Sequence, residues 1–308
     1  MNPLLATLGT KLTERWLNLL VLPGALFLAV AAGGVTLGHR RWNDLDRLRT
    51  VLDGLAARPA MDRAGTVVLL VAGSLLAASA ASLVAQFLGG LIERYWLRFA
   101  RDPLSHALVE WRRRRWRRRD DALRAAFPAA GPVTAADGDA VTVPPRIHAR
   151  IHVLSEARDR VALREPTRPT WYGDRMQATA DRVEAAYGVD LAALWPRLWL
   201  ILPEPAVRQI QSARSSFAAA ARLAAWAAGY AVLGCWWWPA ALIAVGCAAV
   251  ARFRVRDALG ALAELIEAAV DVHALELAAR VGLSGPDAEG LLPRRTGDRM
   301  SEVFRKAE

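Results

Sequence analysis

Two histidines and a glutamate lie at helical spacing in the stretch that follows a proline-rich segment. His148, His152 and Glu156 are spaced i, i+4 and i+8, so a helix would place two imidazoles and a carboxylate on one face. Imidazole and carboxylate groups are ligands that Zn²⁺ accepts. The neighbouring sequence supplies neither an acidic base nor the supporting partners that a catalytic zinc site needs. We therefore interpret the three side chains as a solvated helix face and predict no metal.

A second candidate is the segment REPTRPTWYGDR, residues 164–175. Its two prolines disfavour the helical conformation in the residues before them, so the segment is predicted to be extended. Asp174 is expected to cap the helix that follows. Caps and prolines account for every residue of the segment except Arg168, Trp171 and Tyr172. These three define a candidate binding loop, although packing against membrane-proximal helices is the favoured interpretation.

The most basic stretch of the chain is WRRRRWRRR, Trp111–Arg119. It falls within a helix predicted from Pro103 to about Phe127, soon after an apolar segment. A cluster of this kind beside a membrane span typically contacts anionic lipid headgroups, at about 1 kcal/mol for each charge. Nucleic acid is the competing partner, but the apolar segment favours lipid, or the acidic side chains of the C-terminal helix. The predicted contact residues are Arg112, Arg113, Arg114, Arg115, Arg117, Arg118 and Arg119.

Motifs that would identify an enzyme are missing from the sequence. It contains no Walker loop, no dinucleotide-binding glycine motif and no nucleophile elbow, and its five histidines are scattered. Cys235 and Cys247 both lie in apolar segments, which excludes a disulfide framework and favours small buried side chains. We therefore expect a protein without catalytic activity and without a cofactor, although a membrane lipid enzyme with an irregular site would escape such a search.

The elements that must position these residues are apolar helices. Hydrophobic residues make up 54% of the 308 residues, the net charge is +10, and the preference for arginine over lysine is typical of a GC-rich bacterial genome. Residues 17–37, 66–92 and 217–250 are long enough to cross a hydrocarbon core of about 30 Å. Trp236–Pro239 divides the last stretch, which is predicted to be a helical hairpin. Its arms are short, so a re-entrant hairpin remains an alternative.

Arginines predict how these spans are oriented. They cluster after residue 92 and after residue 250, and positively charged flanks of spans stay in the cytoplasm. The expected protein is therefore a multi-pass cell-membrane protein of the bacterial inner membrane, with both termini cytoplasmic. The predicted outer loop, residues 38–65, also carries arginines, which opposes this topology. An alternative is a signal peptide cleaved after Ala29–Ala31, but the long amphipathic arm at residues 1–16 favours a retained anchor.

Small residues recur every four positions along the second span. Such rows let helix backbones approach closely, within one bundle or between subunits, so we expect tight packing and a homo-oligomer or a membrane-protein partner. The alternative is a pore lined by the hydroxyl and amide groups. One row contains Gly73, Ala77, Ala81, Ala85 and Gly89, and the polar residues of its neighbour are Ser74, Ser82 and Gln86.

The predicted fold is an all-α polytopic membrane protein. Two spanning helices precede a cytosolic helical domain, and a helical membrane hairpin follows it. The predicted segments are 1–16 (N-terminal arm), 17–92 (two spans), 93–216 (cytosolic domain, with a linker at 128–145), 217–251 (hairpin), 252–281 (cytosolic helix) and 282–308 (disordered tail). Within the domain, helices are predicted at 146–164, 175–187 and from 191 onward.

Two classes of function are compatible with this organisation. The first is a non-catalytic membrane module whose cytosolic domain binds a partner or senses a state, with tight packing through the second span. The second is an oligomeric ion channel, or a membrane-perturbing effector, gated by the same domain. The absence of an acidic ring or a backbone filter motif favours the first.

Overall fold

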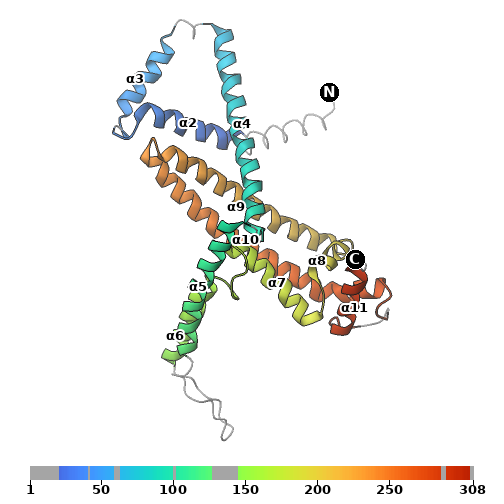
Figure 1. The fold of residues 1–308 in the computed structure, drawn as a ribbon. Coiled ribbons are helices and arrows are strands. Elements are labelled where there is room, and N and C mark those ends of the chain that lie inside the picture. The colour runs from blue at the N-terminus through green and yellow to red at the C-terminus, as the bar shows by residue number, and fades with distance from the viewer. Residues whose placement is uncertain are drawn as a thin grey trace, which may run out of the picture. The chain divides into compact units, whose positions relative to one another are not determined.

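The computed structural model describes residues 21–40, 42–58, 63–99, 102–126, 145–285 and 289–305 (Figure 1). Every regular element in these ranges is a helix, and no strand occurs among them, so the described chain is all-α as predicted. The chain divides into two compact units. The first comprises residues 1–93 and 216–255, and the second comprises residues 94–215 and 256–308.

The first unit contains the apolar helix α2 (Leu22–Leu37), the amphipathic helix α3 (Leu45–Ala56), most of α4 (Ala64–Leu97), and the adjoining parts of α9 (Glu204–Gly234) and α10 (Trp238–Arg280). The break between α9 and α10 falls at the tryptophan–proline motif, as the sequence predicts. Helix α3 lies inside the predicted outer loop, where Asp44 stabilises its first turn by accepting a hydrogen bond from the backbone N–H of Arg47.

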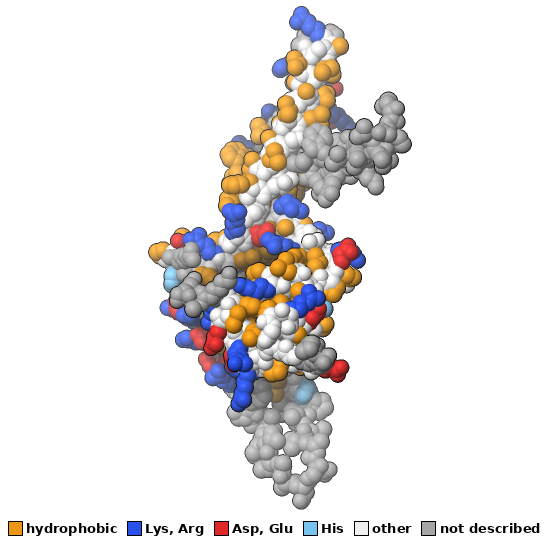
Figure 2. All heavy atoms as spheres, turned by 90° about the vertical axis from the view of Figure 1, so that its right-hand side faces the viewer, with side chains coloured by type: hydrophobic (Ala, Val, Ile, Leu, Met, Phe, Trp, Pro, Cys, Tyr) orange, Lys and Arg blue, Asp and Glu red, His pale blue; other side chains and the backbone are white. Residues whose placement is uncertain are grey.

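Among the described residues, three helices are long and apolar enough to cross a membrane, namely α4, α9 and α10. Helix α2 is apolar but has only 16 described residues, and the predicted first span begins outside the described ranges. Figure 2 shows apolar side chains over the visible face of α4. Val68, Leu69 and Leu76 are among the exposed apolar side chains of this helix. An exposed apolar surface of this extent is typical of a helix that faces lipid or a partner. These helices are consistent with a multi-pass membrane protein.

The buried seam of α4 differs from both predicted rows of small residues. It consists of Ala78 and Ser82 from the second row, followed by Ala85 and Gly89 from the first. A row spaced by four residues winds around a helix of 3.6 residues per turn, so a neighbouring helix contacts positions i, i+4, i+7 and i+11 instead. Of the remaining predicted residues, Ala81 is partly buried, whereas Gly73, Ser74, Ala77 and Gln86 are exposed.

Glycines allow two close helix crossings along this seam. Gly24 of α2 lies against the backbone carbonyl of Ala78 and the hydroxyl of Ser82. Gly89 lies against the backbone of Arg222 in α9, whose Cα would be 3.0 Å from an added Cβ. The Ser82 hydroxyl is buried and has no hydrogen-bond partner within the described residues. These contacts hold α2 and α9 on α4 in the way that small residues hold membrane helices together.

We expect Gly24→Ala to weaken the first unit by about 1–3 kcal/mol, because the new methyl group overlaps the Ala78 carbonyl and lies 2.9 Å from the Ser82 hydroxyl. Gly33→Ala in the same helix is the matched control, since a Cβ there meets no atom within 4 Å. Helical circular dichroism during unfolding by an ionic detergent measures both. Equal unfolding midpoints for the two variants would contradict the crossing.

The second unit contains the remaining helices of the described chain. They are α5 (Pro103–Ala126), α6 (Pro145–Asp159), α7 (Trp171–Tyr187), α8 (Leu191–Trp199) and α11 (Arg294–Arg305), joined by the ends of α4, α9 and α10. Their core gathers buried apolar side chains from α7, α8, α9, α10 and α11 and from the α7–α8 junction. Its members include Val189, Leu194, Leu198, Val270, Ala274, Ala278 and Met300.

Several boundaries in the second unit differ from the predictions. Helix α10 runs without interruption from the hairpin to Arg280, because no glycine or proline separates Val250 from the predicted cytosolic helix. Helix α6 ends at Asp159, five residues before the predicted end at 164. The tail predicted to be disordered contains α11, whose Met300 and Phe304 are buried in the core. The N-terminal arm at 1–16 and nearly all of the linker at 128–145 lie outside the described residues.

Candidate functional site

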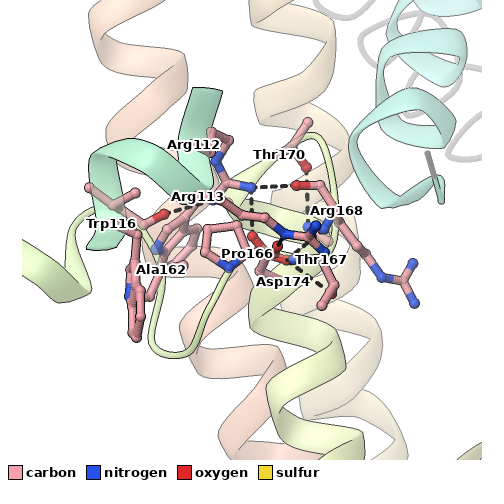
Figure 3. A network of polar contacts seen from close by, with 12 residues as sticks. Arg112, Arg113, Trp116, Ala162, Pro166, Thr167, Arg168, Thr170 and Asp174 are labelled. Carbon is pink, nitrogen blue, oxygen red and sulfur yellow. Dashed lines mark hydrogen bonds and ion pairs between the residues drawn. The ribbon is translucent and has the colours of Figure 1, made fainter. Parts of the chain in front are cut away.

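The candidate site is the contact between α5 and the segment between α6 and α7, residues 160–170, called here the proline loop. Figure 3 shows the buried guanidinium of Arg112 at its centre. Arg112 is 7% exposed and donates hydrogen bonds to the Asp174 carboxylate at 2.5 Å, the Arg168 carbonyl at 2.6 Å and the Val161 carbonyl at 2.7 Å. A single side chain thus binds both ends of the loop and the first turn of α7.

Asp174 organises the loop from the other side. Its second carboxylate oxygen accepts hydrogen bonds from the backbone N–H groups of Thr167 and Arg168, both at 2.9 Å (Figure 3). The residue that caps α7 is Thr170, not the predicted Asp174. The Thr170 hydroxyl accepts a hydrogen bond from the N–H of Gly173, and α7 begins at Trp171 rather than at residue 175. Asp174 therefore faces into the protein, where it neutralises a buried cation and satisfies two loop amides.

Other side chains of α5 donate to the carbonyls of the loop. The Arg113 guanidinium donates to the Pro166 carbonyl and the Trp116 indole donates to the Ala162 carbonyl, both at 2.9 Å. Arg117 pairs with the Glu165 carboxylate at 2.5 Å, but this pair is exposed. Because two prolines keep the loop out of regular structure, its carbonyl groups need donors from elsewhere, and the arginine-rich helix supplies them.

The structure brings together the three residues of the candidate binding loop, Arg168, Trp171 and Tyr172. Arg168 donates to the carbonyl of Leu97 at 2.6 Å and lies 3.7 Å from the ring centroid of Phe99. Tyr172 contacts Trp96, with ring centroids 4.7 Å apart.

These contacts place the proline loop at the C-terminal end of α4, whose last carbonyls have no partner within their own helix. The Thr170 hydroxyl donates to the Trp96 carbonyl and Arg168 donates to the Leu97 carbonyl, so the loop caps α4. The guanidinium of Arg256 in α10 stacks on the indole of Trp171, the first residue of α7, at 4.7 Å from the ring centroid. The loop therefore joins α4, α5, α7 and α10 within the second unit.

The arginine-rich stretch is divided between two faces of α5. Arg112 and Arg113 bind the proline loop, and Arg119 donates to the Ala157 carbonyl of α6. The exposed members of the predicted set are Arg114, Arg115, Arg117 and Arg118. Sequence composition alone could not separate these groups, because all of them are arginines. Their positions around the helix indicate which side chains face inward only once it is known where the neighbouring segment packs.

The acidic face predicted on the C-terminal helix has partners on α7, not on the arginine-rich helix. Glu267 forms an ion pair with Arg182, and the Asp271 carboxylate accepts a hydrogen bond from the Tyr187 hydroxyl at 2.6 Å. The hydrogen bond to Asp271 is the main cause that raises the pKa of Tyr187 to about 12. Partial burial is the largest single influence on Glu267 and would raise its pKa, but the hydrogen bonds from Arg182 and Thr179 and the nearby positive charges together outweigh burial and lower that pKa.

The histidine face of α6 is exposed. His152 lies 3.6 Å from Glu156, and His148 is exposed on the same helix. Within the residues that the structure describes, no group of three or more histidine, cysteine, aspartate or glutamate side chains is arranged to hold a metal ion.

The role of Asp174 is the main feature that sequence reasoning missed. Its position after a proline-containing turn suggested a helix cap, whereas its strongest partner, Arg112, lies 62 residues away along the chain.

Comparison with known proteins gives no further guide, since no family model, no curated protein and no solved structure matches this chain.

Proposed function

We propose that the chain is a non-catalytic multi-pass membrane protein whose second unit is a cytoplasmic binding module, with α5 resting on the anionic inner surface of the membrane. The apolar helices α4, α9 and α10, together with a first span that includes α2, would give four spans with both termini inside. Arg94 in the last turn of α4, Arg98 just after it, and Arg252 and Arg254 after the hairpin support this orientation.

The observation that carries this proposal is the exposed stripe of α5. Leu104 is 80% exposed and Trp111 is 57% exposed, and Leu108 lies between them on the same face. The next turns of that face carry Arg115 and Arg118, and the guanidinium of Arg115 lies 5.5 Å from the ring centroid of Trp111. Apolar and aromatic side chains followed by arginines form the pattern of a helix that lies in the membrane interface.

The position of this stripe along the chain supports the same conclusion. Helix α5 begins six residues after the end of α4, so its first turn lies within about 20 Å of the end of a candidate span. The outward arginines add attraction to anionic headgroups, at about 1 kcal/mol each. The inward arginines Arg112 and Arg113 donate hydrogen bonds to carbonyls of the proline loop and so contribute to folding of the module.

A spin label at Ala107→Cys, with both native cysteines replaced by serine, tests the docking of α5 in the full-length protein in nanodiscs. We expect the label to lie at lipid depth when phosphatidylglycerol is present. The triple variant Arg114→Gln, Arg115→Gln, Arg118→Gln should shift this equilibrium toward water by on the order of 100-fold. Electron paramagnetic resonance with oxygen and nickel relaxants reports the depth.

The matched control removes three exposed arginines elsewhere in the second unit, as Arg146→Gln, Arg295→Gln, Arg299→Gln. This variant has the same net charge and should leave the label at lipid depth. A label that is equally accessible to water with and without anionic lipid would rule out the docking of α5.

One observation favours the channel alternative. The Gln86 amide is exposed on α4 within an apolar segment, where a second copy of the chain would satisfy it better than lipid does. An oligomer assembled through this face would place the Gln86 amide along a pore. A steady, ion-selective current across planar bilayers would favour the channel, and a silent bilayer containing correctly inserted protein would favour the binding module.

A further inference from the structure

A cavity of about 600 Å³ lies in the second unit, between α7, α8 and α10. Its volume is within the range of small-molecule binding sites, about 300–1,000 Å³. Most of its wall is apolar, with Met176 and Ala180 on α7, Trp195 on α8 and Ile266 on α10. Arg168 of the proline loop lines it as well, so the cavity lies directly beside the candidate site.

Arg168 is a desolvated cation without an acidic partner. Its guanidinium donates to the Leu97 carbonyl and to the Gln177 side-chain oxygen, and within the described residues no carboxylate forms an ion pair with it. Its Nε atom is buried and has no hydrogen-bond partner in this part of the chain. Burial lowers the pKa of Arg168, and the carboxylates of Asp174 and Asp181 offset this only in part. An anion would complete the charge balance.

The charges at the other end of the cavity are already balanced or exposed. Asp190 and Arg305 form a two-point ion pair, with the guanidinium nitrogens 2.9 and 3.1 Å from one carboxylate oxygen. Glu184 is exposed. Among the cavity-lining residues, Arg168 is thus the cation that forms no ion pair with a carboxylate of the described chain, and the apolar wall extends away from it along α7.

We infer that this cavity binds an anionic amphiphile of medium chain length, with its carboxylate or phosphate group at Arg168 and its alkyl chain along Ala180, Trp195 and Ile266. From Gln177 to Glu184 the helix rises roughly 10 Å, which matches an extended alkyl chain of about eight carbons. The inference deepens the proposed function, because it gives the module a class of ligand. It does not depend on the docking of α5 and is tested separately.

The four methionines of the chain offer a site-specific probe. In full-length protein labelled with ¹³C at the methionine methyl groups, in phosphatidylcholine nanodiscs, the Met176 signal should shift saturably on titration with decanoate or with decyl phosphate. Decanol should bind at least about tenfold more weakly, because it lacks the charge that Arg168 pairs with. The Met300 signal, from a side chain that is fully buried in the core, reports that the protein remains folded.

Two variants separate the cavity from the nanodisc lipid. Ala180→Trp fills the cavity without changing a charge, and Arg168→Gln removes the positive charge. Both variants should abolish the saturable shift of the Met176 signal. The control Arg295→Gln, on the exposed face of α11, should retain it. A response to decanoate but not to decyl phosphate would identify a carboxylate ligand, and the reverse a phosphate ligand. A shift that is equal for decanol and decanoate, or that persists in a folded Ala180→Trp variant, would overturn the inference. Neither result bears on the spin-label test of α5.

Discussion

Asp174→Ala should destabilise the second unit by about 3–5 kcal/mol. The substitution leaves the Arg112 guanidinium buried without its counter-charge, and removing one partner of a buried ion pair has a cost of this size. It also removes the acceptor for the backbone N–H groups of Thr167 and Arg168. Native-state hydrogen exchange of α6 and α7 amides in the full-length protein measures the loss as a lower free energy of opening.

Two further variants identify the cause of that loss. Asp174→Asn keeps an acceptor for the loop amides but presents an amide nitrogen to Arg112, so it should remain destabilising. Glu165→Ala breaks the exposed pair with Arg117 and should change the free energy by less than about 1 kcal/mol. If Asp174→Ala cost no more than Glu165→Ala, the buried network would have no special role in holding the proline loop.

Local signals in the sequence were sufficient wherever a few neighbouring residues decide the structure. Helix α7 ends at Tyr187 as predicted, followed by Gly188 in a left-handed conformation, and the Asp190 side chain caps α8 by accepting from the Ala192 N–H. The tryptophan–proline turn between α9 and α10 is another local signal. In each case the residue types and their order determine the outcome without any distant partner.

Distant contacts explain what sequence reasoning missed. The carbonyls bound by Arg112 belong to residues 49 and 56 positions away, so no pattern near Arg112 distinguishes it from the other arginines of α5. Similarly, the small residues of α4 are visible in the sequence, but the buried seam is fixed by where Gly24 and Arg222 approach it. The sequence showed which residues were unusual, whereas the packing decided which of them face inward.

The C-terminal helix shows a local signal that was overlooked. The segment after residue 282 is polar and interrupted by glycine and proline, which is typical of disorder. Met300 and Phe304 are nevertheless spaced i, i+4, and both pack into the core of the second unit. Ser301 adds a polar contact, since its hydroxyl donates to the Gly188 carbonyl and accepts from the Asp190 N–H. Two apolar side chains in a single short helix are enough when a preformed surface receives them.

Gly297→Ala should release α11 from this surface. Inside a helix, replacing glycine by alanine ordinarily stabilises by about 0.5–1 kcal/mol. At Gly297, however, an added Cβ overlaps the backbone carbonyl of Tyr187 and lies 2.7 Å from a methyl group of Val189. The carbonyl belongs to the end of α7 and cannot move aside as a flexible side chain would. The sign of the effect should therefore reverse, and amides 294–305 should lose most of their protection against hydrogen exchange.

Gly260→Ala in α10 is the matched control, because a Cβ at that position meets no atom within 4 Å. It should stabilise its helix slightly and leave α11 fully protected. The ¹³C signal of the Met300 methyl group gives an independent reading, since this side chain is fully buried when α11 is docked and would move into solvent on release. Protection of α11 in Gly297→Ala equal to that in Gly260→Ala would show that the contact between α11 and the end of α7 is looser than the structure places it.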